Sequence, residues 1–188
     1  WVAMLRPTLV HLLRLLGVDA HWYVMSPGDF SDDNSPFVFT KKMHNILQRR
    51  LDPNNRIDGA GKSIHQKWNE ENARVLTAQK TIRKADIIVL DDPQPAPLKK
   101  HIDKVNPNVK WVWRSHIDTS NKLMSDQTTP QSEVASYILD ECGIRDVDAV
   151  VAHPVNEFVY PGMDAKTFFA PATIELRDDL NCPLTSSE

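Results

Sequence analysis

The sequence is poor in the features that mark several large classes of protein. It has two cysteines, Cys142 and Cys182, among 188 residues, which are too few for a disulfide framework and lie in no CxxC or His-rich pattern. Its 22 basic and 25 acidic residues nearly balance, so neither nucleic acid nor an anionic membrane is expected as a bulk partner. A reducing, cytoplasmic setting fits this composition best.

Long apolar runs are missing as well. The leucine-rich start of the chain is interrupted by proline and by charged or polar residues, namely Arg6, Pro7, His11 and Arg14. It therefore has neither the roughly 18 consecutive apolar residues of a membrane span nor the order of a signal peptide. Leucines at helical spacing, followed by Gly17, predict an amphipathic helix over residues 3–16.

Glycine is scarce, with six residues, and several catalytic motifs are incomplete. Gly61-Lys62-Ser63 resembles the end of a P-loop, but Arg56 stands where that pattern requires glycine. No two of the seven histidines are three or four residues apart, which argues against a metal site built from neighbours in the sequence. Ser115, His116 and Asp118 are too close in the sequence to form a catalytic triad, and no GxSxG motif is present.

What is present is an alternation of helical and strand patterns. Apolar and β-branched runs predict strands over 18–25, 86–90, 110–113 and 148–152, and helical periodicity predicts helices over 40–50, 63–84, 95–105 and 130–142. The last helix has Thr129 as N-cap and Gly143 after its end. This alternation predicts one α/β domain with a doubly wound, mainly parallel sheet. The runs at 86–90 and 148–152 are continuously apolar, as expected when helices cover both faces of a strand.

Three of the predicted strands run directly into polar clusters. These are Asp91-Asp92-Pro93-Gln94, Arg114-Ser115-His116 and His153-Pro154-Val155-Asn156. In an open parallel sheet the carboxyl ends of the strands share one edge, where ligands bind. Carboxylates, carboxamides, Arg and His suit the hydroxyl groups of a polyol. Trp111 and Trp113 lie on one face of their strand, where packing under a helix is expected rather than sugar stacking.

The order of several short motifs resembles the amino-terminal domain of retaining trehalose phosphorylases, including the fungal clock-controlled type, and of related nucleotide-sugar-dependent trehalose synthases. The motifs are Val2-Ala3-Met4, His44-Asn45-Ile46-Leu47-Gln48, Glu71-Asn72-Ala73, Asp91-Asp92-Pro93-Gln94, Arg114-Ser115-His116-Ile117 and His153-Pro154-Val155-Asn156-Glu157-Phe158. Each motif is weak alone, whereas the ordered set is specific. The resemblance covers roughly residues 2–180.

This resemblance implies the amino-terminal half of a GT-B glycosyltransferase, in which two Rossmann-like domains face each other across a cleft. It implies that residues 1–180 form the acceptor-side domain, without its first strand and glycine loop, and that 181–188 lead toward a second domain that holds phosphate or a nucleotide sugar. The implied substrates are trehalose and glucose, with no cofactor and no metal. Nucleic acid and membrane are not expected as partners, and a homodimer is left open.

The resemblance also implies roles for individual residues. His116 and Arg114 match the catalytic positions near the transferred glucose. The acceptor-sugar positions are His44, Asn45, Gln48, Asp92 and Gln94, and a wider cleft would include His153 and Asn156. For His116 and His153 the alternative is a hydrogen-bonded structural histidine.

Three functions stay open at this point. The first is the acceptor domain of a trehalose phosphorylase, inactive on its own, and the second is the same domain of a nucleotide-sugar-dependent synthase or another retaining glycosyltransferase. The third is a truncated or degenerate domain that binds sugar or a partner as a regulator. The resemblance implies a glycine loop before Val2 that would bind phosphate through backbone N–H groups, whereas only Trp1 stands there, and the missing loop modestly favours the third.

Overall fold

The computed structural model describes residues 6–28 and 35–170, and the chain divides into two compact units. One unit is Trp1–Val24 with Ala172–Glu188 and contains helix α1 (Arg6–Leu15), followed by Gly17 at φ +83°. This confirms the predicted helix over its described residues and the left-handed glycine. The predicted helix start at residue 3 and the tail at 181–188 lie outside the described residues.

The second unit, Met25–Pro171, contains a parallel sheet of four strands in the order β1-β2-β3-β4. The strands are β1 (Ile87–Asp91), β2 (Lys110–Arg114), β3 (Ala149–Ala152) and β4 (Thr167–Phe169). The first three confirm the strands predicted from apolar runs, and the parallel α/β, Rossmann-like class is confirmed with them. The three-residue strand β4 was not predicted. Among the described residues, no helix has the length and apolarity needed to cross a bilayer.

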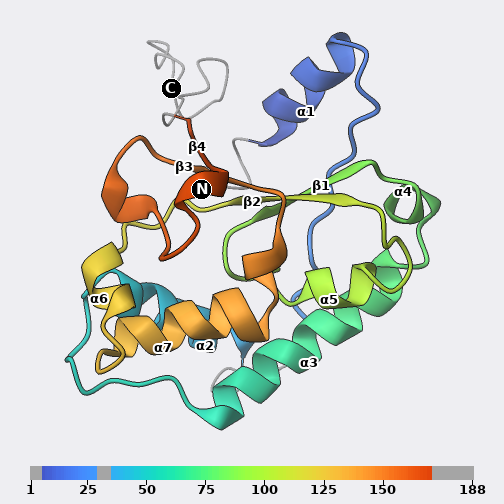
Figure 1. The fold of residues 1–188 in the computed structure, drawn as a ribbon. Helices are drawn as coiled ribbons and strands as arrows, with labels where there is room; N and C mark the ends of the chain where they lie inside the picture. Colours follow the sequence, from blue (N-terminus) through green and yellow to red (C-terminus); the bar gives the residue numbers. More distant parts are fainter. Residues whose placement is uncertain (1–5, 29–34, 171–188) are drawn as a thin grey trace, which may run out of the picture. The chain divides into compact units, whose positions relative to one another are not determined.

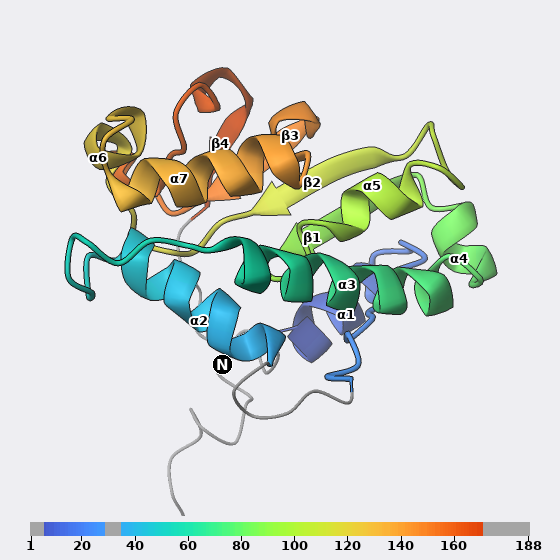
Figure 2. The same cartoon turned by 90° about the horizontal axis from the view of Figure 1, so that it is seen from below.

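This unit also contains helices, most of which lie against one face of the sheet. They are α2 (Pro36–Leu47), α3 (Gly59–Leu76), α4 (Lys80–Arg83), α5 (Leu98–Ile102), α6 (Asn121–Ser125) and α7 (Pro130–Ser136), which continues as the π-helical turn η3 (Tyr137–Glu141). This unit also contains three short 3-10 turns among its described residues: η4 (Ile144–Asp146), η5 (Asn156–Phe158) and η6 (Asp164–Lys166). Helices α2, α3, α5 and α7 lie below the sheet in Figure 1 and face the viewer in Figure 2.

This one-sided arrangement follows from the strand order. Parallel strands that are adjacent in both sequence and space, joined by right-handed crossovers, place each crossover on the same face. Trp111 and Trp113 point to that face and are 2% and 0% exposed, as predicted. Ile87 and Val89 point to the other face and are 61% and 57% exposed. Within the described residues of this unit, helices therefore cover one face of β1, whereas the apolar run had suggested both.

One predicted element is absent, and two predicted helix boundaries differ because local capping decides where these helices start. The predicted strand over 18–25 is not a strand, since no described segment forms a β-ladder with it. Helix α2 starts at Pro36 rather than residue 40, because the Ser35 hydroxyl accepts a hydrogen bond from the Phe37 N–H. The predicted helix over 63–84 is two helices, and α3 starts earlier because Asp58 caps the Gly61 N–H.

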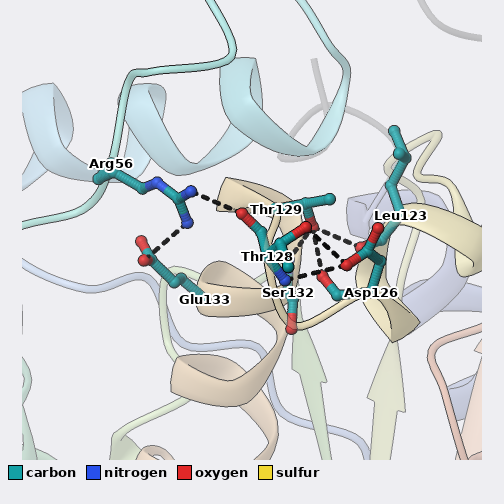
Figure 3. Close-up of polar contacts among 7 residues, drawn as sticks. All are labelled: Arg56, Leu123, Asp126, Thr128, Thr129, Ser132 and Glu133. Carbon is teal, nitrogen blue, oxygen red and sulfur yellow. Dashed lines mark hydrogen bonds and ion pairs between the residues drawn. The ribbon is translucent and has the colours of Figure 1, made fainter.

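The start of α7 agrees with the prediction in detail. The Thr129 hydroxyl accepts from the Ser132 N–H at 3.1 Å, and Gly143 follows the π-helical turn at φ +83°. Figure 3 shows how Arg56, from the α2–α3 loop, reaches this helix start. Its guanidinium donates to the Thr128 carbonyl at 2.6 Å and to Glu133 Oε1 at 2.8 Å. Arg56 thereby connects the loop between α2 and α3 to the start of α7, which is distant in the sequence.

A double-mutant cycle measures the Arg56–Glu133 contact. Both side chains are 41% exposed, so solvent screens their attraction, and we expect a coupling free energy of unfolding of only about 0.2–1 kcal/mol. The Arg56→Ala variant should lose somewhat more than this, because the Thr128 carbonyl also loses its donor. Urea unfolding of Arg56→Ala, Glu133→Ala and the double variant provides the measurement. Strictly additive losses would contradict the contact.

Candidate functional site

The carboxyl ends of β1, β2 and β3 meet at one edge of the sheet, as the sequence predicted. Asp91 is in register with Arg114, and Arg114 with Val151. Backbone bonds continue past the strands, since the Asp92 N–H donates to the Arg114 carbonyl at 3.1 Å and the Ser115 N–H to the Val151 carbonyl at 2.9 Å. The polar residues that directly follow β1 and β2 are therefore held by the ladder itself.

Asp92 lies at the centre of this edge. Its Oδ1 is 3.5 Å from His44 Nε2 of α2, and its Oδ2 is 3.5 Å from His116 Nε2 of the loop after β2. The Asp92 side chain is 11% exposed, while the two imidazoles are 21% and 24% exposed. The structure thus brings three predicted site residues together from three separate segments.

The backbone of Asp92 is also unusual. Its φ of +77° lies in the left-handed region, which Asp and Asn adopt more readily than most residues other than glycine. The Trp113 indole N–H donates to the Asp92 carbonyl at 3.3 Å, in addition to the bond from the Asp92 N–H to the Arg114 carbonyl. Such conformations persist when surrounding contacts fix them, and they concentrate at functional sites.

Burial shifts the ionisation of this cluster. Burial and, second, the charge of Asp91 raise the pKa of Asp92 from 3.8 to about 7, against the opposing effect of Arg114. Burial, with His116 and Lys41, lowers the pKa of His44 from 6.5 to about 4. At neutral pH His44 is therefore uncharged, and Asp92 exists in both its acid and its carboxylate forms.

Arg114 provides the positive charge at this edge. Its guanidinium lies 3.3 Å from Asp91 Oδ1, and both side chains are about one-quarter exposed, at 25% and 27%. The arginine is therefore oriented by Asp91 yet retains N–H groups for a ligand, since a guanidinium carries five donors.

Two buried hydroxyls lie close to the cluster: that of Tyr160, which the sequence analysis did not single out, and that of Ser115, which it named without a role in the site. Tyr160 and Ser115 are 0% and 1% exposed, and both hydroxyl oxygens are buried. The pKa of Tyr160 is raised by burial and by the nearby Asp92 charge, while the neighbouring Ser115 hydroxyl opposes this shift. Tyr160 also packs edge-on against Trp113, at 4.9 Å between ring centroids. Tyr160 begins a Tyr-Pro-Gly sequence, and no local sequence signal places its buried side chain here.

Polar residues of α3 hold the loop after β1. The Gln94 carbonyl accepts from His65 Nε2 at 2.8 Å and from Asn69 Nδ2 at 3.1 Å. Burial lowers the pKa of His65 to about 4, so its ring is neutral. With Nε2 as donor, Nδ1 accepts from the Tyr137 hydroxyl at 2.8 Å. This hydrogen-bonded chain fixes the position of the segment that carries Asp92 and Gln94.

An open groove begins at His44. It has a volume of about 730 Å³, which is within the range of small-molecule sites. Its walls come from α2, the loop after it and the loop after β1: Phe37, Val38, Thr40, Lys41, Lys42, His44, Asn45, Leu51, Asn55 and Gln94. The groove therefore contains three predicted acceptor positions, His44, Asn45 and Gln94.

Other predicted residues lie further from the cluster. Gln48 caps the end of α2 through its backbone and does not line the groove. His153 packs edge-on against Phe158 of its own loop, at 4.8 Å between ring centroids, and Asn156 is exposed at the start of η5. Their contacts fit the structural alternative for His153, and their roles in a wider cleft stay predictions.

Residues of the incomplete P-loop and triad motifs form other contacts in the structure. Lys62 of the apparent P-loop lies within α3 and forms an ion pair with Glu141 at 2.5 Å. Asp118 lies 3.7 Å from Arg49. Within residues 6–28 and 35–170, no set of three His, Cys, Asp or Glu side chains is arranged to hold a metal ion.

Comparison with known proteins gives a consistent set of relatives. The family model described as "Trehalose synthase, N-terminal domain" matches residues 1–160. Trehalose phosphorylase of Pleurotus sajor-caju is 37% identical over 163 residues, which are 84% of this chain and 20% of that protein. The phosphorylase of Grifola frondosa is 34% identical over the same length.

A trehalose synthase is also similar over the full chain. The protein of Thermococcus litoralis is 29% identical over 188 residues, which are 100% of this chain and 40% of that relative. The chain therefore spans about a fifth of the length of the phosphorylases that it matches and two fifths of the synthase.

Proposed function

Because the chain belongs to the family of trehalose synthase N-terminal domains, we propose that it is the acceptor-side domain of a retaining glucosyltransferase, most simply a trehalose phosphorylase. The reaction converts α,α-trehalose and phosphate into α-glucose 1-phosphate and glucose. One glycosidic C–O bond breaks, one C–O bond to phosphate forms, and the released glucose takes up a proton. The observation that carries this proposal is the meeting of His44, Asp92 and His116 beside a groove of about 730 Å³.

The chemistry of these groups suits a hexose. Glucose hydroxyls donate and accept hydrogen bonds, and a neutral imidazole such as that of His44 offers one donor and one acceptor. The carboxamides of Asn45 and Gln94 provide the same pair of functions along the groove wall. In this proposal Gln48 and Asp92 complete the acceptor side, and His116 with Arg114 contacts the glucosyl unit that is transferred.

In the proposed mechanism this domain positions the acceptor and stabilises the transfer. A fixed acceptor hydroxyl converts a bimolecular attack into an effectively unimolecular one. The Arg114 guanidinium and the His116 ring provide fixed hydrogen-bond donors for the negative charge that develops on the leaving oxygen. The departing phosphate is expected to bind mainly to a second domain of the complete protein, so no step here requires a metal or cofactor from this chain.

A nucleotide-sugar-dependent trehalose synthase is the second candidate, supported by the similarity to the Thermococcus litoralis synthase over the whole chain. The donor site would decide between the two enzymes. A sugar-binding regulatory domain is the third. Cytoplasmic location and a homodimer stay predictions for the complete protein.

The test offers trehalose to the complete protein with either inorganic phosphate or a nucleoside diphosphate. We expect glucose and glucose 1-phosphate with phosphate. A nucleotide sugar formed only with the diphosphate would identify the synthase, and no turnover with either would leave a regulatory domain. The 188-residue chain alone should form no glucose 1-phosphate, and phosphorolysis by that pure chain would refute the proposed division between acceptor and donor domains.

A further inference from the structure

The carboxyl group of Asp92 is better placed to contact the two histidines than to contact a sugar. Its side chain is 11% exposed, and each oxygen is 3.5 Å from a ring nitrogen, Oδ1 from His44 and Oδ2 from His116. Both His44 Nε2 and Asp92 Oδ1 are buried without a close hydrogen bond within the described residues. Buried polar atoms of this kind normally have partners, so a small movement of the His44 ring toward Asp92 would satisfy both atoms.

The backbone around Asp92 fixes the position of the carboxyl. Two hydrogen bonds, from its N–H to Arg114 and from the Trp113 indole to its carbonyl, hold the residue at φ +77°. The next loop residues are held in turn by His65 and Asn69 through the Gln94 carbonyl. Asp92 is thus a rigid element between a helix side chain and a strand-end side chain.

We infer that Asp92 is a positioning residue which couples His44 of the acceptor groove to His116 at the reacting centre, so that the ring orientation and proton of one depend on the other. The inference builds on the proposed function, where Asp92 was an acceptor-sugar ligand. It changes that role, since the carboxyl now acts through the two imidazoles.

The charges around the carboxyl allow this coupling. Asp91 from β1 and Arg114 from β2 face it with opposite charges, and Tyr160 lies beneath it. Lys41 of α2 faces His44. With the pKa of Asp92 raised to about 7 and that of His44 lowered to about 4, the acid form of Asp92 can donate to the neutral His44 ring. The carboxylate form can accept from either ring.

The decisive experiment is a pH titration of the 188-residue chain by proton–nitrogen correlation spectra of the histidine rings. In the unmodified protein, ring nitrogens of both His44 and His116 should report one shared inflection near neutral pH, which arises from Asp92. In the Asp92→Asn variant this inflection should vanish from both rings. Asn carries no titrating proton, and it also adopts the left-handed backbone that this position requires.

Asp118→Asn is the matched control. Asp118 lies two residues after His116 and contacts Arg49, so its loss should leave the shared inflection in place. A second variant covers poor folding of Asp92→Asn: His116→Gln should shift the inflection reported by His44. If only one ring changes, or neither does, in a folded variant, the coupling is refuted.

A kinetic measurement on the complete protein separates the two roles of Asp92. As a positioning residue, its change to Asn should lower kcat roughly tenfold or more, remove the limb of the kcat–pH profile near neutrality, and leave the KM for glucose nearly unchanged. A raised KM with an unchanged pH profile would indicate that Asp92 contacts the sugar directly, and it would overturn the inference. Absence of glucosyl transfer in the unmodified protein would refute the proposed function, while the histidine titration still decides the coupling.

Discussion

Replacement of His116 by Ala in the complete protein should lower the kcat of glucosyl transfer by roughly two to four orders of magnitude. In the proposed mechanism this imidazole contacts the transferred glucose, and Asp92 Oδ2 lies 3.5 Å from its Nε2. Loss of the ring removes a fixed polar contact that is strongest in the transition state, so kcat should fall more than KM rises. Steady-state phosphorolysis and synthesis of trehalose would both be measured.

Arg114→Ala should give a loss of similar size for an electrostatic reason. Arg114 opposes the effect of Asp91 on the Asp92 pKa, so its removal leaves two carboxyls close together without the nearby cation. A guanidinium donor to the substrate is lost at the same time.

His101→Ala serves as the control for both variants. His101 lies on α5, outside the sheet edge and outside the groove that begins at His44, and it should retain normal kcat. Unchanged thermal unfolding of the three variants would show that the losses are local. Near-normal turnover in both His116→Ala and Arg114→Ala would remove these residues from the site.

The sheet and its polar edge could be predicted because their signals are local. Short apolar runs define β1 to β3, and the rule for parallel sheets places the residues after them at one edge. The 188-residue length favoured one domain, but the domain end at residue 180 stays a prediction because it lies outside the described residues. The predicted strand over 18–25 failed because a strand needs a neighbour that no local pattern reveals.

The polar core was harder to predict. On α3 the apolar Val75 is 57% exposed, whereas the polar His65 and Asn69 are both 0% exposed. These polar side chains are buried because they bind the Gln94 carbonyl, and that partner comes from a different segment. The meeting of His44, Asp92 and His116 is equally non-local. The resemblance selected these three residues, while their contact required the structure.

Asp92→Asn should raise the free energy of unfolding at about pH 8 by roughly 2–4 kcal/mol relative to the unmodified chain. The pKa of Asp92 is raised from 3.8 to about 7 in the folded state. Between these values the unfolded chain has released a proton that the folded chain retains, so stability falls as pH rises. Asn carries no charge to bury and is free of this penalty.

His44 and His65 have the opposite pH dependence. Their folded-state pKa values are lowered from 6.5 to about 4, so their contribution to stability is complete above about pH 6.5 and is lost as pH falls toward 4. The two histidines therefore make the chain more stable as pH rises from about 4 to 6.5, and in the unmodified chain Asp92 partly cancels this increase. The free energy of unfolding of Asp92→Asn should therefore increase more steeply with pH over the same range, from about 4 to 6.5. The two proteins should differ little near the lower end and most above about pH 7.

Urea unfolding at a series of pH values, followed by tryptophan fluorescence, measures this difference. Trp68, Trp111 and Trp113 are 2%, 2% and 0% exposed, so their emission reports on the unit that contains the cluster. Asp118→Asn removes an exposed carboxylate from the same edge and should run parallel to the unmodified chain. Parallel curves for Asp92→Asn as well would mean that Asp92 is fully ionised at neutral pH.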